Sequence, residues 1–243
     1  MMITSRDNPI YKHIKKLMTD KRAREDAGVY VVCGEPFLLR EALAANAKVE
    51  TVYAECVADL TAVNVQLMSP DLLRSLMPVD STASLLFTVQ LPKMMTCVDP
   101  AKRYLVLDGV ADPGNAGTLL RTAAAFGLDG VIALEGTVNF YNDKVVRAAS
   151  GALFTLDLLA MNAEELVSMK VDMYVSVVPN ANETVLQPQE LRGMRGCLVI
   201  GNEARGVSEI MRSAATQLVT VPIYGDSLNA AVAGGILMYE FSG

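Results

Sequence analysis

The stretch YLVLDGVADPGNAGTLLRTAAAF, residues 104–126, predicts a strand, a loop and a helix in direct succession. Residues 104–107 form an uncharged apolar run that is typical of a buried strand. Apolar residues of the second half recur at intervals of three and four, which indicates a helix with one buried face: Ala116, Leu119, Leu120 and Ala123. We expect Asn115 to cap this helix and Arg121 to lean back over the loop, because helical side chains tilt toward the N-terminus. The joint offers two polar side chains at the carboxyl end of a strand, where α/β proteins bind ligands.

This joint alone does not identify a ligand. Asn115 by itself is more often a helix cap than a catalytic residue. The loop lacks both the Gly-Lys-Ser/Thr end of a P-loop and the GxGxxG pattern of a dinucleotide site. Two later stretches repeat the order of strand, glycine loop and helix: LVIGNEARGVSE at 198–209 and VPIYGDSLNAAVAGGILMYEF at 221–241.

Together the three stretches resemble the three motifs of the SpoU (TrmH-type) RNA ribose 2′-O-methyltransferases, a family of the SPOUT superfamily. The first motif, Asp-Pro-x-Asn-x-Gly with a later arginine, is matched by Asp112, Pro113, Asn115, Gly117 and Arg121. The second, Gly-x-Glu-x-x-Gly, is matched by Gly201, Glu203 and Gly206. The third, Ser-Leu-Asn before a helix of small residues, is matched by Ser227, Leu228 and Asn229. One motif is a weak signal, whereas three in this order across residues 103–243 are a strong one.

The resemblance implies methyl transfer from S-adenosyl-L-methionine to a ribose 2′-hydroxyl of structured RNA, with ribosomal RNA favoured over transfer RNA. It implies that five polar residues meet at the transfer point: Asn115, Arg121, Glu203, Ser227 and Asn229. It also implies that the later loops, including Gly225, bind the donor through backbone groups and aliphatic side chains: Ile200, Gly201, Asn202, Gly206, Val221, Ile223 and Leu228. Taken singly, core packing explains the aliphatic residues, helix capping explains Ser227, and helix-dipole compensation explains Glu203 equally well.

Three roles for Arg121 stay open. Family proposals make this arginine the group that takes the proton of the 2′-hydroxyl, assisted by the substrate phosphate. A guanidinium is almost never neutral, so Arg121 could instead orient that phosphate and stabilise the developing alkoxide charge. The third role is that of an ordinary helical arginine exposed to solvent.

Alternating strands and helices across residues 103–243 predict a parallel α/β sheet. The expected strands are 104–107, 131–134, 173–178, 197–200 and 218–222. The family resemblance, and no periodicity, implies a trefoil knot. It also implies a homodimer in which Arg121 serves the donor pocket of the partner. Small residues in the expected last helix, 229–238, allow a second helix to approach, although tight packing within one chain explains them too. The third motif departs from the family, because only four residues separate Pro222 from Ser227, about two fewer than in relatives.

Residues 1–92 predict a small α/β domain, followed by a linker that reaches residue 102. The expected elements are helices at 10–17, 37–45 and 71–77 and strands at 29–33, 50–54 and 85–89. In the helix at 37–45 we expect Leu38, Leu39 and Leu43 to face inward. The order resembles the L30e-like domain that binds RNA substrate ahead of the methyltransferase domain in many SpoU enzymes. Cys33 departs from the family pattern, which has a glutamate there.

The charge pattern leaves room for an RNA partner. The net charge is −6, but residues 1–24 hold seven basic side chains against two acidic ones. We expect Lys15, Lys16 and Arg22 to contact phosphates, and Lys144 and Arg147, which share a helix face, to do the same. A helix face exposed to solvent explains either set equally well.

Several classes of function are disfavoured. The four cysteines are widely spaced and His13 is the only histidine, which argues against a zinc site or a histidine-based triad. We therefore expect no metal, and reduced, buried thiols in a cytoplasmic protein. Residues 228–239, the longest uncharged apolar run, are too few to span a bilayer, and polar residues 6–8 precede any apolar run, so we expect neither a membrane partner nor a signal peptide.

Two rival functions remain. One is an RNA-binding protein of SpoU fold that has lost methyl transfer. The other is a nucleotide-dependent enzyme of the doubly wound type, which the missing GxGxxG loop disfavours.

Overall fold

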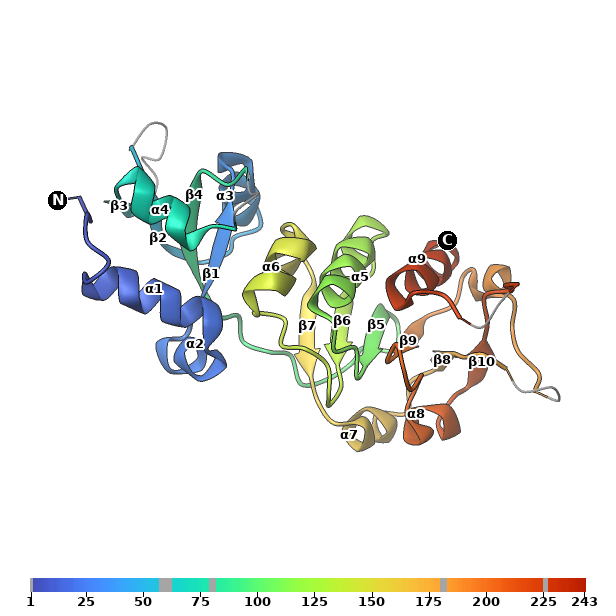
Figure 1. The fold of residues 1–243 in the computed structure, drawn as a ribbon. Helices are drawn as coiled ribbons and strands as arrows, with labels where there is room; N and C mark the ends of the chain where they lie inside the picture. Colours follow the sequence, from blue (N-terminus) through green and yellow to red (C-terminus); the bar gives the residue numbers. More distant parts are fainter. Residues whose placement is uncertain (1, 57–62, 79–81, 180–182, 225–226) are drawn as a thin grey trace. The chain divides into compact units, whose positions relative to one another are not determined.

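The computed structural model describes residues 2–56, 63–78, 82–179, 183–224 and 227–243 (Figure 1). The chain divides into two compact units, of which the first contains residues 1–93 and 141–154 and the second residues 94–140 and 155–243. The segment 141–154 was expected in a continuous C-terminal domain, 103–243, but it groups with the first unit. Long-range ring contacts explain this, since Tyr141 packs against Tyr30 and Phe154 against Phe87, with ring centroids 4.8 and 6.4 Å apart.

The described part of the first unit contains a mixed sheet in the order β1-β4-β2-β3. Its strands are β1 (Val29–Gly34), β2 (Val49–Ala54), β3 (Val65–Leu67) and β4 (Leu85–Gln90). β4 runs antiparallel to β1 and β2, whereas β2 and β3 are parallel. The three strands expected here are confirmed to within one residue at each end, and β3, only three residues long, was not predicted.

Helices of the first unit are α1 (Pro9–Thr19), α2 (Lys21–Ala27), α3 (Pro36–Ala44), α4 (Pro70–Leu76) and α6 (Asp143–Ala149), with a 3₁₀ turn η1 (Ala152–Phe154). The expected inward position of Leu43 in α3 is wrong, because its side chain is 38% exposed. Ala42 completes the buried face with Leu38 and Leu39. Each residue of a helix is rotated by about 100° from the one before it, so Leu43 lies away from the face that contains Ala42.

The second unit is built on a parallel sheet, which confirms the predicted α/β fold with a parallel sheet. In the described residues the strand order is β10-β8-β9-β5-β6-β7, and every neighbouring pair is parallel. The strands are β5 (Arg103–Asp108), β6 (Gly130–Ala133), β7 (Asp157–Ala160), β8 (Met173–Ser176), β9 (Gly196–Gly201) and β10 (Gln217–Val219). β7 was not predicted, and β8 and β10 end earlier than expected.

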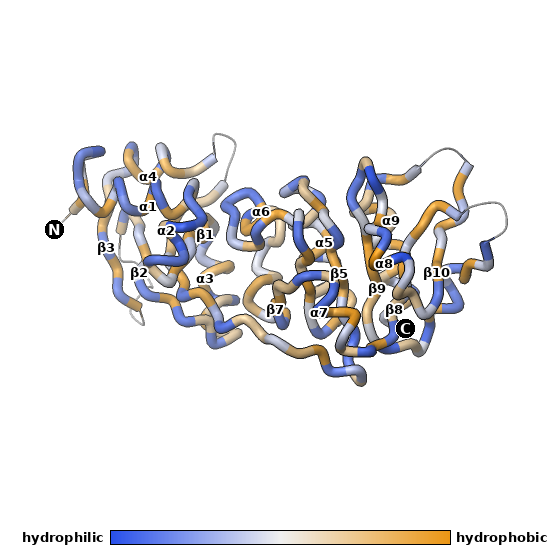
Figure 2. Tube along the Cα trace, turned by 90° about the horizontal axis from the view of Figure 1, so that it is seen from below, coloured by the Kyte–Doolittle hydropathy of each residue, from blue (hydrophilic) through white to orange (hydrophobic). Residues whose placement is uncertain are grey.

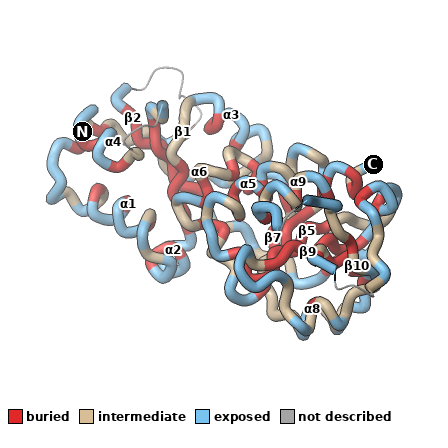
Figure 3. Tube along the Cα trace, turned by 45° about the vertical axis from the view of Figure 1, so that its right-hand side comes forward, coloured by how far each residue is buried: buried red, intermediate tan, exposed pale blue. Residues whose placement is uncertain are grey.

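Helices cover both faces of this sheet (Figure 1). α5 (Pro113–Ala125) packs beside α9 (Ala230–Phe241) on one face, and α7 (Ala163–Ser168) and α8 (Glu209–Ser213) lie on the other. Because β5 and β9 are central, they are buried along their length (Figure 3). The apolar middle of β9 follows from its sequence CLVI at 197–200 (Figure 2). Central strands buried on both faces carry continuous apolar runs of this kind.

The cysteines are free, but only part of the expectation about them holds. Cys197 is buried and Cys33 half-buried, and burial raises the pKa of each thiol to about 12. Cys56 and Cys97 are exposed, against the expectation of buried thiols, because they lie in the irregular segments that follow β2 and β4. None of the described helices combines the length and the hydropathy needed to cross a lipid bilayer.

Candidate active site

The first two motif loops begin side by side at the carboxyl edge of the sheet. β5 and β9 are neighbours in register, and their last residues, Asp108 and Gly201, are paired. The first motif follows β5 and leads into α5, whereas the second motif follows β9 and leads into α8. Parallel pairing of two strands far apart in sequence therefore joins the two motifs.

A chain of hydrogen bonds connects side chains from all three motifs. The Asn229 amide Nδ2 donates to Oδ1 of Asn115 at 3.0 Å, and the Asn115 amide Nδ2 donates to Oε1 of Glu203 at 2.8 Å. The backbone amides of Ala231 and Val232, which can only donate, bond to Oδ1 of Asn229 and so orient its amide. The direction of these hydrogen bonds is therefore set at the start of α9, and the last of them is accepted by the Glu203 carboxylate.

The expected Asn115 cap is wrong, and helix capping, the alternative explanation for Ser227, does not hold either. Asp112, not Asn115, caps α5, since its Oδ1 accepts the backbone N–H of Asn115 at 2.8 Å and Pro113 is the first helical residue. Asn229, not Ser227, caps α9, and Ser227 lies exposed in the segment before it. Because the Asp112 side chain accepts the free backbone N–H at the start of α5, the Asn115 side chain is available to bridge Glu203 and Asn229.

Asn202 shapes the second loop. Asn202 and Gly206 exchange two backbone hydrogen bonds of 2.9 Å, and Gly206 has a φ of 71°, which favours glycine. The Asn202 side-chain oxygen accepts the backbone N–H groups of Ala204 and Arg205 at 3.0 and 3.1 Å. Its Nδ2 donates to the Gly109 carbonyl at 2.8 Å. One amide side chain thus holds the second loop closed and ties it to the first.

Gly201 is required by the loop itself. A Cβ at this position would overlap with the backbone of Val207 and lie 2.6 Å from the Gly206 carbonyl oxygen. Gly201→Val would therefore force the second loop open whatever binds there, so this variant could not report on donor binding alone.

A buried carboxylate adds a further brace that the sequence reasoning missed. Asp108, 7% exposed, accepts the backbone N–H of Ser208 at 2.6 Å, and Ser208 caps α8. The available signal was an aspartate that ends an apolar strand directly before a glycine. This bond connects the end of β5 to the helix that follows the second motif.

Arg121 lies on the exposed side of α5, opposite Leu119, Leu120 and Ala123, which are fully buried as expected. No hydrogen bond or ion pair joins its guanidinium to another residue that the structure describes. Its position therefore does not bring it into the hydrogen-bonded chain around Asn115, and its charge is available to a ligand or a partner.

The candidate donor residues divide by exposure. Ile200 and Gly201 are buried at the end of β9, and Val221 is half-buried. Ile223 and Leu228 are 38% and 37% exposed, and Gly225 lies outside the described residues. Leu228 directly precedes Asn229, so an exposed aliphatic side chain adjoins the hydrogen-bonded residues in the sequence and is available to a ligand.

The candidate RNA-binding residues lie in the first unit. Lys15, Lys16 and Arg22 are exposed, and Arg22 lies 3.9 Å from Asp26. Lys144 is exposed, but Arg147 donates to Asp143 at 2.5 Å, so the shared basic face is partly neutralised. The spacing of four between Asp143 and Arg147 was the signal for this ion pair.

Comparison with known proteins places these features in a family. Residues 102–239 match the model of the SpoU rRNA methylase family. The chain is 31% identical to the 23S rRNA (guanosine(2553)-2′-O)-methyltransferase RlmP of Bacillus subtilis over 99% of both proteins. It is 36% identical to the 23S rRNA (guanosine-2′-O-)-methyltransferase RlmB of Xylella fastidiosa, over 56% of each chain.

Solved structures agree. An rRNA methyltransferase from Sinorhizobium meliloti with bound AdoMet superposes with a TM-score of 0.88 at 25% identity, covering 99% of this chain and 96% of that one. The SpoU methyltransferase AviRb from Streptomyces viridochromogenes has the same fold, with a TM-score of 0.81 at 23% identity over 97% of each chain.

The three-loop site on a parallel sheet is that of a methyltransferase of the SPOUT type, and the chain belongs to the SpoU rRNA methylase family. Enzymes of this family use S-adenosyl-L-methionine. The residues present here fit such a donor, because the closed second loop offers backbone groups and the third motif offers exposed aliphatic side chains. Among the described residues, no three His, Cys, Asp or Glu side chains gather to hold a metal ion.

Proposed function

We propose that this chain transfers a methyl group from S-adenosyl-L-methionine to the 2′-hydroxyl of a guanosine ribose in 23S rRNA. The observation that carries the proposal is the hydrogen-bonded chain Asn229–Asn115–Glu203, which joins the three motifs at one point. The full-length similarity to a 23S rRNA guanosine 2′-O-methyltransferase supports the choice of substrate.

Each polar residue of the site receives a role in this proposal. When bound, the donor supplies an activated methyl group on its sulfonium. Asn115, Asn229 and Ser227 orient the reacting ribose and the donor, and Glu203 fixes the Asn115 amide while its other oxygen, Oε2, remains available to accept a hydrogen bond. Arg121 stays charged, so we assign it the stabilisation of the 2′-oxygen as negative charge develops, together with binding of the adjacent phosphate.

We assign donor binding to the second and third loops. Asn202 and Gly206 hold the second loop in a closed shape, from which Gly201 and Ile200 present backbone groups. Val221, Ile223 and Leu228 supply apolar contacts. Because these residues precede α9, donor binding also acts on the position of Asn229.

A homodimer completes the proposal. Val232, Ile236 and Tyr239 follow one another at intervals of four and three along α9 and are 51%, 39% and 60% exposed. An apolar stripe of this kind on a helix indicates a partner helix. We propose that a second copy covers it and that Arg121 acts at the donor site of the partner.

Mixing two impaired variants tests this arrangement, at a donor concentration too low to saturate the Asn202→Ala site. Arg121→Ala and Asn202→Ala disable different parts of the site, so a mixed dimer regains one complete site only if Arg121 acts across the interface. Activity recovered on mixing supports the proposal, and no recovery in a confirmed mixed dimer places Arg121 in the site of its own chain.

The remaining parts of the proposal concern the RNA and the topology. Lys15, Lys16 and Arg22, together with Lys144 and Arg147, bind RNA phosphates from the first unit, whose character is L30e-like. The second unit contains the trefoil knot of the family. A cytoplasmic location is proposed because rRNA is modified where ribosomes are assembled.

The decisive experiment is methyl transfer. Ribosomal RNA from cells that lack the protein is incubated with the protein and labelled donor, and 2′-O-methylated positions are mapped before and after. A new 2′-O-methylguanosine in 23S rRNA is expected. Binding of donor and RNA without any new methylation would favour the rival function, an RNA-binding protein of SpoU fold.

A further inference from the structure

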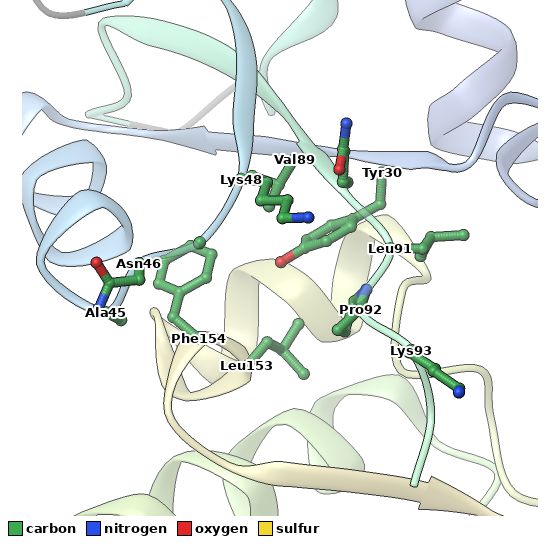
Figure 4. A pocket seen from close by; sticks show the side chains of 12 residues that line it. Tyr30, Ala45, Asn46, Lys48, Val89, Leu91, Pro92, Lys93, Leu153 and Phe154 are labelled. Carbon is green, nitrogen blue, oxygen red and sulfur yellow. The ribbon is translucent and has the colours of Figure 1, made fainter.

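A cavity of about 310 Å³ lies within the first unit, whereas the motif loops belong to the second unit (Figure 4). Four segments line it: β1, the turn after α3, the end of β4 with the following chain, and η1. The lining residues used below are Tyr30, Asn46, Lys48, Lys93, Leu153 and Phe154. The volume lies at the lower end of the roughly 300–1,000 Å³ range of small-molecule sites, so it suits one small group rather than a large cofactor.

The Tyr30 hydroxyl indicates that the cavity is a binding site. Tyr30 is only 2% exposed, and Figure 4 shows its oxygen pointing into the space beside Phe154 and Leu153. Its hydroxyl makes no hydrogen bond to any other residue that the structure describes. Burial, and to a smaller extent Tyr141, raises the pKa of Tyr30, so the hydroxyl remains protonated and can donate. The hydroxyl oxygen is not among the fully buried side-chain atoms without a partner in the described residues; it opens onto the cavity and can donate to a group bound there.

The charge of the lining selects an anion. Lys48 and Lys93 line the cavity, and none of the described lining residues is acidic. The nearby Glu50 is engaged by the Gln90 amide at 3.0 Å and is not part of the lining. Figure 4 shows the Lys48 side chain reaching toward Tyr30. The Lys93 side chain points away from Tyr30 in the same view, so a phosphate near the Tyr30 hydroxyl would be bound by Lys48.

The remaining lining selects a flat ring. Phe154 is half-buried, so part of its ring remains accessible, and Leu153 contributes an apolar wall. Asn46 offers an amide that can pair with the edge of a base. Proteins that read single-stranded RNA stack unpaired bases on aromatic rings and hold the backbone with basic side chains.

We propose that this cavity binds one unpaired nucleotide of the RNA substrate, with its base against Phe154, a polar group on Tyr30 and its phosphate at Lys48. The inference rests on the proposed function for the identity of the ligand as RNA. It assigns recognition of an extruded nucleotide to the first unit, separate from the nucleotide that is methylated.

The test compares two hairpin RNAs that differ by a single bulged nucleotide, titrated by fluorescence anisotropy without methyl donor. The bulged hairpin is expected to bind about tenfold more tightly than the fully paired one, the effect of one base–aromatic stacking contact. Phe154→Leu should remove most of this preference, and Tyr30→Phe should reduce it about fivefold, as for one lost hydrogen bond. Lys48→Ala should weaken binding of the bulged hairpin most.

Matched controls separate the cavity from general effects. Tyr53→Phe removes another buried tyrosine hydroxyl of the first unit, and Lys21→Ala removes another exposed lysine; both lie outside the lining and should retain the bulge preference. Equal affinity for both hairpins, or a preference unchanged in Tyr30→Phe and Phe154→Leu, overturns the proposal.

Free ligands distinguish the source of the nucleotide. In calorimetry, nucleoside 5′-monophosphates should bind weakly, but still more tightly than inorganic phosphate does. Tight binding of a free mononucleotide without any bulge preference would make the cavity a metabolite site and overturn the RNA assignment. Since no donor is present, loss of the bulge preference is distinguishable from absence of methyl transfer.

Discussion

Replacement of Gly234 by alanine tests whether close packing of α9 on α5 positions the active site. A Cβ at Gly234 would overlap with Cδ2 of Leu119 and lie 3.5 Å from Cγ1 of Ile200. Leu119 is fully buried, so it has little room to move away. Overpacking of this kind costs about 1–3 kcal/mol, whereas alanine is better than glycine in a helix by roughly 0.8–1 kcal/mol. Gly234→Ala should therefore destabilise the protein by up to about 2 kcal/mol.

The neighbouring Gly235 provides a matched control. A Cβ there would have its nearest neighbour, Cγ2 of Thr122, at 4.0 Å, which is an ordinary contact. Gly235→Ala gains the same helix propensity without the overlap, so it should stabilise the protein by about 0.5–1 kcal/mol. The difference between the two variants, about 1–3 kcal/mol, then reports the packing cost alone.

Urea unfolding of the two variants, followed by circular dichroism, measures this difference through the midpoint at constant slope. Donor-dependent methyl transfer is measured on the same samples. Because α9 carries Asn229 and α5 carries Asn115, a shift between these helices should also break their 3.0 Å hydrogen bond and lower turnover in Gly234→Ala only. Equal stability of the two alanine variants would refute the claim that Gly234 sets the helix–helix distance.

Three further predictions concern the site and the RNA. Arg121→Ala should lower the rate of single-turnover methyl transfer by roughly 10²-fold or more while changing the free energy of unfolding by about 0.5 kcal/mol or less. Arg121→Lys keeps the charge without the planar guanidinium, so it should restore only what a point charge can do. A near-normal rate in Arg121→Ala would make Arg121 an ordinary surface residue. Asn202→Ala removes three hydrogen bonds that shape the second loop. Donor affinity measured by calorimetry should therefore fall about tenfold or more. An unchanged affinity would show that the loop closes without this side chain. Removal of residues 1–24 should weaken RNA binding and lower its salt dependence by roughly 0.7–0.9 per lost phosphate contact, provided circular dichroism shows that the truncated protein is folded; an identical salt slope would exclude the arm from the interface.

The amino-acid sequence by itself determined the local elements and the chemistry of the motifs. The strand–loop–helix joint at 104–126 was predictable because an apolar run and a 3–4 residue periodicity are encoded within a few neighbouring positions. The parallel sheet followed from alternation of such segments. Short strands such as β3 and β7, with three and four residues, carry too little pattern to be read in this way.

Tertiary structure alone decided which residues meet. The sequence placed Asn115 at a helix cap, but the cap is Asp112, and the freed amide bridges Glu203 and Asn229, which lie 88 and 114 positions further along the chain. The membership of segment 141–154 in the first unit likewise depends on ring contacts with Tyr30 and Phe87. Periodicity and capping rules describe interactions over a few residues, whereas these contacts exist only because strands and helices distant in sequence pack together within each unit.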